Sequence, residues 1–328
     1  MADPYKVVRS ERLLPLDIRE RKPSWLKVRP PSGERYKWIK EQRVGLGLST
    51  VCEEAQCPNI GECWGEGTAT FMVMGSICTR GCRFCAVTTK KQGDPLDPLE
   101  PQKLGETIAA MDLDYIVVTS VDRDDLPDEG AGHFASCVQA VNALSPKTKV
   151  EILHPDFSGR MDLVDVVVTS GADVLAHNIE TVRRLTPAVR DRRAGYDQSL
   201  EVLARVKECD PEAVSKSSIM VGLGESRDEV IECMRDLRAV GVDILTLGQY
   251  LRPSKKHIAV EEYISPDLFA DYEQVAAELG FLFCASGPLV RSSYRAAEVF
   301  TRGLLADRER GHSGGKRIAA TRRLKVIS

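Results

Sequence analysis

The chain has 328 residues, ten of them cysteines, and a formal net charge of −3. Its hydrophobic content of 43% is ordinary for a globular protein, and its length fits one large domain or two small ones. No run of about 18 apolar residues is present, which excludes a membrane-spanning segment. The N-terminus lacks the apolar core of a signal peptide, and with four acids among its first twenty residues it is too acidic for a transit peptide. We therefore expect a cytoplasmic location.

Lysine and arginine gather at both ends of the chain. Residues 1–40 carry eleven of them against five acids, and residues 301–328 carry eight against two. Such basic ends predict either docking to an acidic protein partner or solvated extensions. Neither end contains a nucleic-acid-binding module, so no nucleic-acid partner is expected.

Three cysteines, Cys78, Cys82 and Cys85, follow a C-x3-C-x2-C spacing within eight residues. Thiolates at this density select zinc, copper(I) or an iron–sulfur cluster. Structural zinc usually has paired C-x2-C units and four protein ligands, so half of a zinc site is the alternative interpretation. A cubane cluster with three cysteine ligands keeps one iron open for a ligand from outside the protein.

A second triplet, Cys52, Cys57 and Cys63, precedes the first with a C-x4-C-x5-C spacing. One interpretation is a zinc loop with a remote fourth ligand, and another is a disulfide with one free thiol. The third is a second iron–sulfur cluster whose fourth iron takes a ligand other than cysteine. Clustering of six cysteines between residues 52 and 85 favours metal over disulfides.

The first triplet resembles the signature of the radical S-adenosylmethionine (SAM) enzymes. The two triplets together resemble the lipoyl synthases in particular, over about residues 20–305. Matching strings occur along the chain at residues 57–64, 68–72, 119–126, 155–157, 177–182, 222–225 and 287–294.

From residue 68 onward, short apolar runs alternate with amphipathic stretches. Expected buried strands lie at 69–74, 115–119, 150–153, 173–177, 217–221 and 243–247. Expected helices lie at 102–111, 132–144, 160–169, 178–185, 196–208 and 226–240. Six strand–helix units within about 180 residues are too short for a full eight-unit barrel and predict a partial (β/α)6 TIM-type barrel. The resemblance implies the same fold.

The chain is expected to divide into four parts. They are an N-terminal arm with the auxiliary cluster loop (1–67), the partial barrel (68–250), a C-terminal extension (251–305) and a flexible basic tail (306–328). Within the extension we expect a helix at 265–279, a strand at 281–285 and then a loop with paired serines. Serines in such a loop ordinarily cap a helix.

Chemistry in such barrels lies at the C-terminal ends of the strands. Thr119 and Ser120 end the second strand, where the resemblance implies contacts to the amino end of SAM. Asn178 and Glu180 follow the fourth strand and place an amide and a carboxylate beside the pocket. Residues 218–225 resemble the G-x-I-x-G-x-x-E element that packs the adenine, so Gly222 and Glu225 are further candidates, although Ser218 and Met220 depart from the pattern.

Other polar and thiol residues receive structural interpretations. The charged run 122–125 is expected to be a solvated loop. His154 is expected to be structural, whereas His177 is either a hydrogen-bond partner or a strand-end residue. The remaining cysteines lack ligand spacing and are expected in the core: Cys137, Cys209, Cys233 and Cys284.

Resemblance to the lipoyl synthases implies two 4Fe–4S clusters and SAM as cofactors. Cys78, Cys82 and Cys85 would hold the cluster that cleaves SAM to a radical. Cys52, Cys57, Cys63 and Ser293 would hold an auxiliary cluster that is consumed as the sulfur source, and Arg291 would offset the charge of the serine oxygen.

The implied reaction inserts sulfur at C6 and C8 of an octanoyl chain on a lysine of a partner protein. Those partners are lipoyl domains of 2-oxoacid dehydrogenase E2 subunits and the glycine-cleavage H protein. A flavodoxin- or ferredoxin-type electron donor and an iron–sulfur carrier for cluster repair are also implied. Two alternatives are a zinc-stabilised α/β binding protein and another sulfur-inserting radical SAM enzyme of the biotin synthase or methylthiotransferase type.

Overall fold

The computed structural model describes residues 22–27, 38, 49–50, 53, 57, 59–65 and 69–293. Cys52, the tail at 306–328 and the segments around the arm therefore lie outside the described residues. Among the residues described, no helix has both the length and the apolar character needed to cross a membrane.

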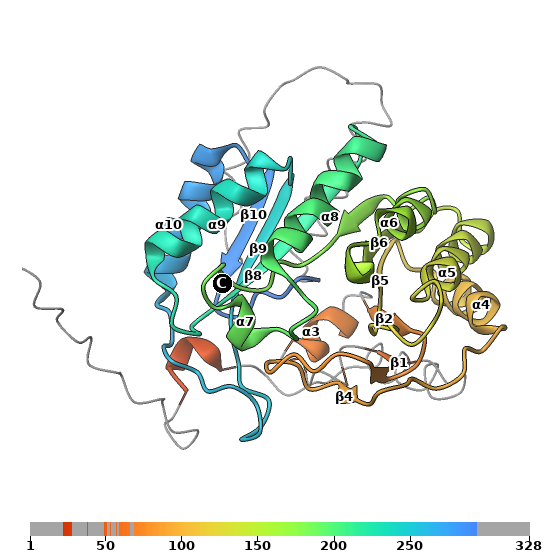
Figure 1. Cartoon of the computed structure of the whole chain (residues 1–328), viewed down its shortest axis with the longest axis horizontal. Coiled ribbons are helices and arrows are strands. Elements are labelled where there is room, and N and C mark those ends of the chain that lie inside the picture. The colour runs from red at the N-terminus through yellow and green to blue at the C-terminus, as the bar shows by residue number, and fades with distance from the viewer. Residues whose placement is uncertain are drawn as a thin grey trace, which may run out of the picture.

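A single curved sheet organises the molecule (Figure 1). Its eight strands run in the order β1-β2-β5-β6-β7-β8-β9-β10, and every neighbouring pair after the first is parallel. The strands are β1 (Ser49–Thr50), β2 (Thr70–Val73), β5 (Tyr115–Ser120), β6 (Lys149–Leu153), β7 (Val174–Ala176), β8 (Val214–Val221), β9 (Ile244–Gln249) and β10 (Phe283–Gly287). Because the described strands β1 and β10 are not paired with each other, the sheet is an open, partial barrel, as predicted.

The strand expected at 281–285 is β10, and it joins the same sheet. It pairs in parallel with β9, so the chain continues the strand–helix pattern beyond residue 250. The loop that follows β10 therefore lies at the same edge of the sheet as the loops after the other parallel strands.

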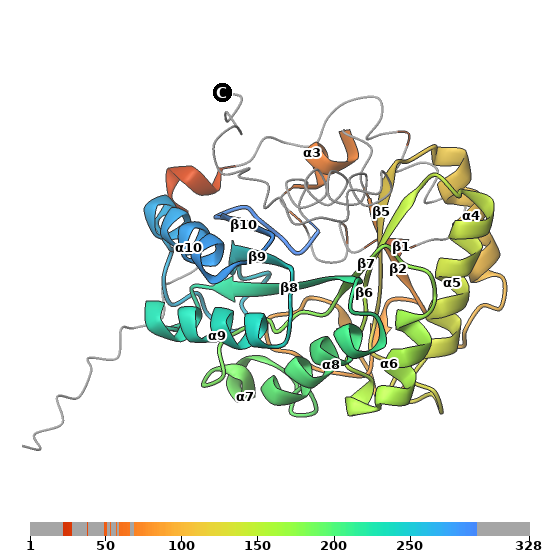
Figure 2. The same ribbon diagram turned by 90° about the horizontal axis from the view of Figure 1, so that it is seen from above.

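Helices cover the outer side of the sheet. Figure 2 shows α4, α5, α6, α8 and α9 following one another along that side, with α10 beside β10. Their bounds are α4 (Glu100–Met111), α5 (Ala131–Leu144), α6 (Met161–Val168), α8 (Tyr196–Cys209), α9 (Arg227–Ala239) and α10 (Pro266–Leu279). Shorter elements are η1 (Ser24–Leu26), α3 (Ile60–Gly65), β3 (Ile77–Cys78), β4 (Thr88–Thr89), η2 (Phe157–Gly159) and α7 (Thr186–Val189).

The helix expected at 178–185 is wrong. Glu180 has a left-handed φ of 69° and forms an isolated parallel bridge with Ile219. Its backbone N–H donates to Ser218 and its carbonyl accepts from Met220, so this segment continues the sheet edge instead of coiling. Only the four-residue α7 follows it, at Thr186–Val189.

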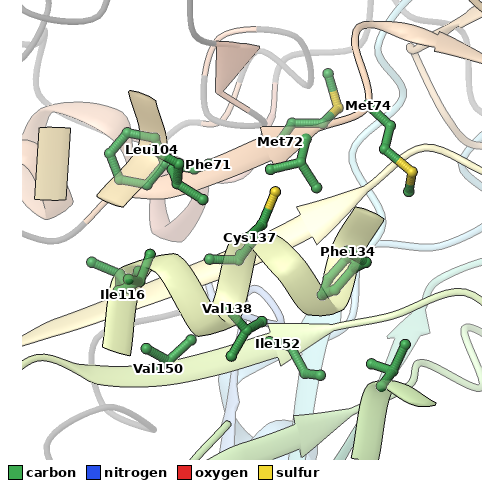
Figure 3. Packing of buried hydrophobic residues seen from close by; sticks show 14 of the residues in the cluster. Phe71, Met72, Met74, Leu104, Ile116, Phe134, Cys137, Val138, Val150 and Ile152 are labelled. Atoms are coloured by element: carbon green, nitrogen blue, oxygen red, sulfur yellow. The ribbon is translucent and has the colours of Figure 1, made fainter. Parts of the chain in front are cut away.

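The main core fills the space between the first strands and their helices (Figure 3). Phe71 and Met72 from β2, Ile116 from β5 and Phe134 and Val138 from α5 are buried there. Strands covered on both faces need apolar side chains at successive positions, which explains the continuous apolar runs in the sequence. The rigid sheet that results fixes the loops at its C-terminal edge.

One polar cluster is enclosed within the sheet. Lys216 Nζ lies 2.7 and 2.9 Å from the carboxylate oxygens of Glu151, and the Tyr115 hydroxyl donates to the same carboxylate at 2.6 Å. All three side chains are buried. Because each charge is paired and hydrogen-bonded, its burial is tolerated.

Candidate active site

A cavity of about 550 Å³ opens at the C-terminal ends of the parallel strands. It is lined by residues of the loops after β2, β5, β6, β7, β9 and β10, and by Ser218, Ile219 and Met220 of β8 itself. Five cysteines of the two triplets line it, together with both loop serines: Cys57, Cys63, Cys78, Cys82, Cys85, Ser292 and Ser293. Segments far apart in the sequence thus bring both sets of predicted metal ligands to one chamber.

The first triplet lies in the loop that starts at the end of β3. The Arg80 backbone N–H donates to Cys78 Sγ at 3.4 Å, and the Asp191 backbone N–H donates to Cys82 Sγ at 3.3 Å. Burial, with Asp122 nearby, raises the pKa of the Cys78 thiol to about 12, and burial raises that of Cys82 to about 12. Metal binding at such thiols must release protons.

The same three thiols fit a cluster better than a single ion. In the described part of the chain, their sulfurs are not gathered within 4.8 Å of one another. Tetrahedral zinc with zinc–sulfur bonds of about 2.3 Å would hold its sulfurs roughly 3.8 Å apart. Three soft donors spread around a wider space, with N–H groups aimed at the sulfurs, suit an iron–sulfur cluster.

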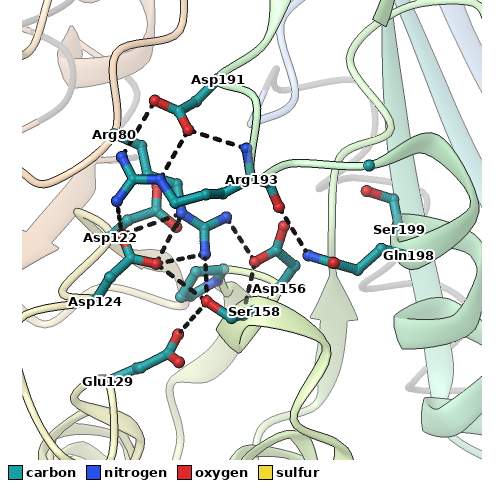
Figure 4. A network of polar contacts seen from close by, with 12 residues as sticks. Arg80, Asp122, Asp124, Glu129, Asp156, Ser158, Asp191, Arg193, Gln198 and Ser199 are labelled. Carbon is teal, nitrogen blue, oxygen red and sulfur yellow. Dashed lines mark hydrogen bonds and ion pairs between the residues drawn. The ribbon is translucent and has the colours of Figure 1, made fainter. Parts of the chain in front are cut away.

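Arg80 anchors this thiol loop to the loops that follow β5 and β6 (Figure 4). Its guanidinium donates to Asp124 at 2.6 Å, to Asp156 at 2.6 Å and to Ser158 at 3.1 Å. The Arg80 side chain is only 2% exposed, so these contacts are shielded from water. A planar fork with several carboxylate partners fixes both the position and the orientation of the loop.

Arg193 and Asp191 hold the loop from the opposite side (Figure 4). Asp191 accepts from the Gly81 backbone N–H at 2.8 Å and from Arg193 at 2.9 Å. Arg193 also donates to the Thr79 carbonyl at 2.7 Å and to Asp124 at 3.3 Å. The loop between Cys78 and Cys82 is therefore clamped by residues from three different strand–helix connections.

The expectation that residues 122–125 form a solvated loop is wrong. Arg123 is 2% exposed and pairs with Asp125 at 2.8 Å, while Asp124 is a partner of Arg80. Burial raises the pKa of the Asp122 carboxyl to about 6, and Arg80 opposes that rise. The charge run gave no signal of this arrangement, because Arg80, the partner that buries Asp124, lies 44 residues earlier in the chain.

Several buried polar atoms face the cavity without a protein partner in the described residues. They are Ser120 Oγ, His154 Nε2, Asp156 Oδ2 and Asn178 Oδ1. Buried polar groups are rarely left unpaired, so these atoms indicate a polar ligand. SAM, with its ammonium, carboxylate and ribose hydroxyl groups, fits such a lining.

The other predicted SAM contacts have protein partners. The Thr119 hydroxyl donates to the Leu153 carbonyl at 2.8 Å, and Glu180 accepts from Asn178 at 3.1 Å. Burial raises the pKa of Glu180, which Arg190 and Asn178 partly offset. Thr119 and Glu180 both line the cavity.

Gly222 and Glu225 are not among the residues that line the cavity. Glu225 accepts from the backbone N–H groups of Gly222 and Leu223 and closes the turn after β8. Gly222 has a φ of 95°, and a Cβ there would meet Gln249 Nε2 at 2.2 Å. These residues shape the loop, whereas Ser218 and Met220 reach the chamber.

The two histidines differ in what their ring nitrogens contact. His177 Nδ1 donates to the His154 carbonyl at 3.0 Å, and its Nε2 accepts from Ser199, which in turn accepts from Arg190. His177 is therefore a structural strand-end residue. His154 Nδ1 donates to the Pro155 carbonyl, which leaves Nε2 as an acceptor facing the cavity. Sequence reasoning missed this second feature.

The second triplet is described for Cys57 and Cys63 only, since Cys52 lies outside the described residues. Burial raises the pKa of the Cys57 thiol, while the Asn59 backbone N–H and the Arg291 guanidinium lower it. Two thiols, two serines and one arginine thus share this side of the cavity. Two thiols and a serine oxygen match three of the four ligands expected for the auxiliary cluster.

Comparisons with known proteins cover most of the chain. Residues 72–237 match the radical SAM superfamily, and residues 7–57 match the N-terminal domain of lipoyl synthase of the radical SAM family. Lipoyl synthase of Anaeromyxobacter sp. strain Fw109-5 is 60% identical over 291 residues, covering 89% of this chain and 99% of that protein. The mitochondrial lipoyl synthase of Culex quinquefasciatus is 57% identical over 295 residues, covering 88% and 78%.

Solved structures agree at the level of the fold. Methylornithine synthase (PylB) superposes with a TM-score of 0.51 at 14% identity, covering 73% of each chain. The FeFe-hydrogenase maturase HydG from Carboxydothermus hydrogenoformans superposes with a TM-score of 0.50 at 13% identity, covering 72% of this chain and 66% of its own. With the near-complete match to named relatives, these findings show that the chain belongs to the lipoyl synthase family of radical SAM enzymes.

Proposed function

We propose that the cavity carries out the sulfur insertion of this family, on an octanoyl chain attached to a lysine of a partner protein. The observation that carries the proposal is the meeting of five cysteines from two separate triplets, with Ser293, around one chamber. The two atoms to be exchanged for sulfur are hydrogens on unactivated carbons. No side-chain base removes such hydrogens, so the chemistry belongs to the cofactors and the protein supplies position and exclusion of water.

In this proposal Cys78, Cys82 and Cys85 hold the first 4Fe–4S cluster. When bound there, the cluster supplies the electron for reductive cleavage of SAM. Ser120 and Asn178 bind polar groups of SAM, because each has a buried oxygen without a protein partner in the described residues. Thr119 and Glu180 line the same cavity, whereas Gly222 and Glu225 hold the turn after β8 in place.

Cys52, Cys57, Cys63 and Ser293 hold the auxiliary cluster in this proposal, which when bound supplies the sulfur atoms. An alkoxide oxygen is a harder ligand than thiolate and a poorer match for a soft cluster, so it is released more readily. Arg291 supports the assignment, because its guanidinium interacts electrostatically with Cys57 and precedes Ser293 by two residues. A ligand that leaves readily suits a cluster that is consumed.

The acyl substrate arrives on a partner protein. We propose lipoyl domains of 2-oxoacid dehydrogenase E2 subunits and the glycine-cleavage H protein as carriers, a flavodoxin- or ferredoxin-type electron donor, and an iron–sulfur carrier for repair. A reducing compartment, the cytoplasm, is proposed as the location. Its support is the clustering of six cysteines between residues 52 and 85, which favours metal binding over disulfides.

Single turnover without added sulfide tests the sulfur assignment. We expect the reconstituted wild-type chain to form lipoyl product and a Cys57→Ala variant to form 5′-deoxyadenosine without it. Cys209→Ala is the matched control, because Cys209 is exposed on α8 and contacts Asp165. Normal product from Cys57→Ala would refute the sulfur-donor assignment.

A further inference from the structure

Two segments that are far apart in the chain meet at Asn59. Its side-chain Nδ2 donates to the Leu289 carbonyl at 2.6 Å, across 230 residues of sequence. Asn59 is only 4% exposed and Leu289 is half-buried, so this hydrogen bond is partly shielded from water. Leu289 lies in the loop after β10, four residues before Ser293.

The backbone of Asn59 forms hydrogen bonds with two cysteines of the second triplet. Its N–H donates to the Cys57 thiol, and its carbonyl accepts from the Cys63 backbone N–H at 2.9 Å. A single residue therefore contacts two predicted cluster ligands through its main chain and the serine loop through its side chain.

The serine loop is itself held against the sheet. Val290 N–H donates to the Gly287 carbonyl at 3.1 Å, and Arg291 donates to the Gln249 carbonyl at 3.4 Å. A Cβ at Gly248 would lie 2.0 Å from the Val290 carbonyl oxygen, so the loop packs directly on β9. With one side fixed on β9, the Asn59 hydrogen bond determines how the other side faces the thiols.

We propose that Asn59 is a positioning residue that locks the serine loop onto the Cys57–Cys63 loop and so holds the oxygen ligand against the auxiliary cluster. The inference rests on the proposed function and extends it to a residue that touches no reacting atom. Aspartate has the same shape but no N–H, so it would place a carboxylate oxygen against the Leu289 carbonyl.

The test measures how fast the auxiliary cluster loses iron to a chelator. It uses full-length chain in which Cys78, Cys82 and Cys85 are all replaced by alanine, so that the iron signal comes from one cluster. In this background we expect Asn59→Asp to release iron about tenfold faster, which corresponds to one lost hydrogen bond. Asn142→Asp is the matched control, because its amide donates to the Gly171 carbonyl at 2.9 Å on the exposed surface.

Two further measurements separate positioning from general destabilisation. In otherwise wild-type chain, Asn59→Asp should keep 5′-deoxyadenosine formation within about twofold while lipoyl product falls. Combined with Ser293→Ala, Asn59→Asp should add no further acceleration of iron loss, because residues acting through one contact are not additive. If the two substitutions multiply each other's effect on the rate of iron loss, the inference is wrong. It is also wrong if Asn59→Asp leaves that rate unchanged, or if lipoyl product and 5′-deoxyadenosine fall in parallel.

Failure of the proposed function gives a different pattern. If Ser293→Ala and Ser292→Ala both leave iron release unchanged, the serine ligand assignment is wrong, whatever Asn59→Asp does. If Ser293→Ala accelerates release and Asn59→Asp does not, the ligand assignment stands and the positioning role of Asn59 is refuted.

Discussion

At the scale of single residues, the cavity is surrounded by buried groups whose charge states the fold determines. His154 and His177 lie side by side, with ring centroids 5.7 Å apart, and desolvation lowers their pKa values to about 4 and about 3. Arg190 and Asp156 are the charged neighbours. Both rings are therefore neutral near pH 7, consistent with each ring donating to a backbone carbonyl through Nδ1.

This predicts acid destabilisation. A histidine whose folded-state pKa lies below its ordinary value of 6.5 favours the unfolded chain when protonated, so its stability contribution is full above pH 6.5 and declines as pH falls toward 4. We expect His154 to contribute a loss on the order of 2 kcal/mol between pH 7 and pH 5. Urea unfolding of the wild type and of His154→Gln gives the free energy of unfolding at pH 7 and at pH 5. The free energy should fall less in His154→Gln between these pH values, and an equal fall in the two proteins would contradict the prediction.

The buried Lys216–Glu151 pair gives a second prediction. Lys216→Met leaves the Glu151 carboxylate in the sheet interior with the Tyr115 hydroxyl as its partner, and should cost about 3–5 kcal/mol. Replacing Glu151 by leucine as well should recover much of that loss. Lys103→Met is the control, since Lys103 pairs with Asp97 at 2.6 Å on the exposed surface, where losing the pair should cost far less stability. Equal costs for both lysines would be the contrary result.

At the scale of elements, the close approach of the β10 loop to β9 depends on Gly248. An alanine there would place its Cβ 2.0 Å from the Val290 carbonyl and displace the loop that carries the serines. Displacement of about 1 Å at a reacting site reduces rates on the order of a hundredfold. We expect Gly248→Ala to lose lipoyl formation while its 5′-deoxyadenosine formation decreases less.

Gly195→Ala is the matched control for this element. A Cβ at Gly195 would lie 3.4 Å from the Gln198 Cβ, an ordinary contact at the start of α8. Its product ratio should equal that of the wild type. If Gly248→Ala keeps the wild-type ratio of lipoyl product to 5′-deoxyadenosine, the packing of the serine loop on β9 is not required for sulfur insertion.

The elements were largely predictable because each one is specified locally. Apolar runs located the parallel strands, and the capping box of Ser226 and Glu229 begins α9 close to the expected residue 226. The prediction of a helix at 178–185 failed because of a contact with a distant part of the chain. The amphipathic spacing of this segment favours a helix, but Glu180 pairs with Ile219 from β8, and that contact is formed only when the sheet assembles.

At the scale of the whole molecule, the cysteines that line the cavity could be singled out from the sequence, and the contacts that support them could not. Cysteine spacing singles out Cys57, Cys63, Cys78, Cys82 and Cys85 because the members of each triplet are close in sequence. Contacts such as Arg80–Asp156 and Asn59–Leu289 join residues 76 and 230 positions apart, and neither has a local signal. Long-range pairing of this kind depends on the partial barrel bringing strand ends together.

Iron and acid-labile sulfide counts on anaerobically reconstituted protein decide whether the cavity holds two clusters. Two cubane clusters predict about eight irons and about eight sulfides per chain, and Cys57→Ala or Cys82→Ala should each reduce both counts to about four. A wild-type count of about four irons, or about one metal ion per cysteine triplet as in a zinc site, would contradict the account.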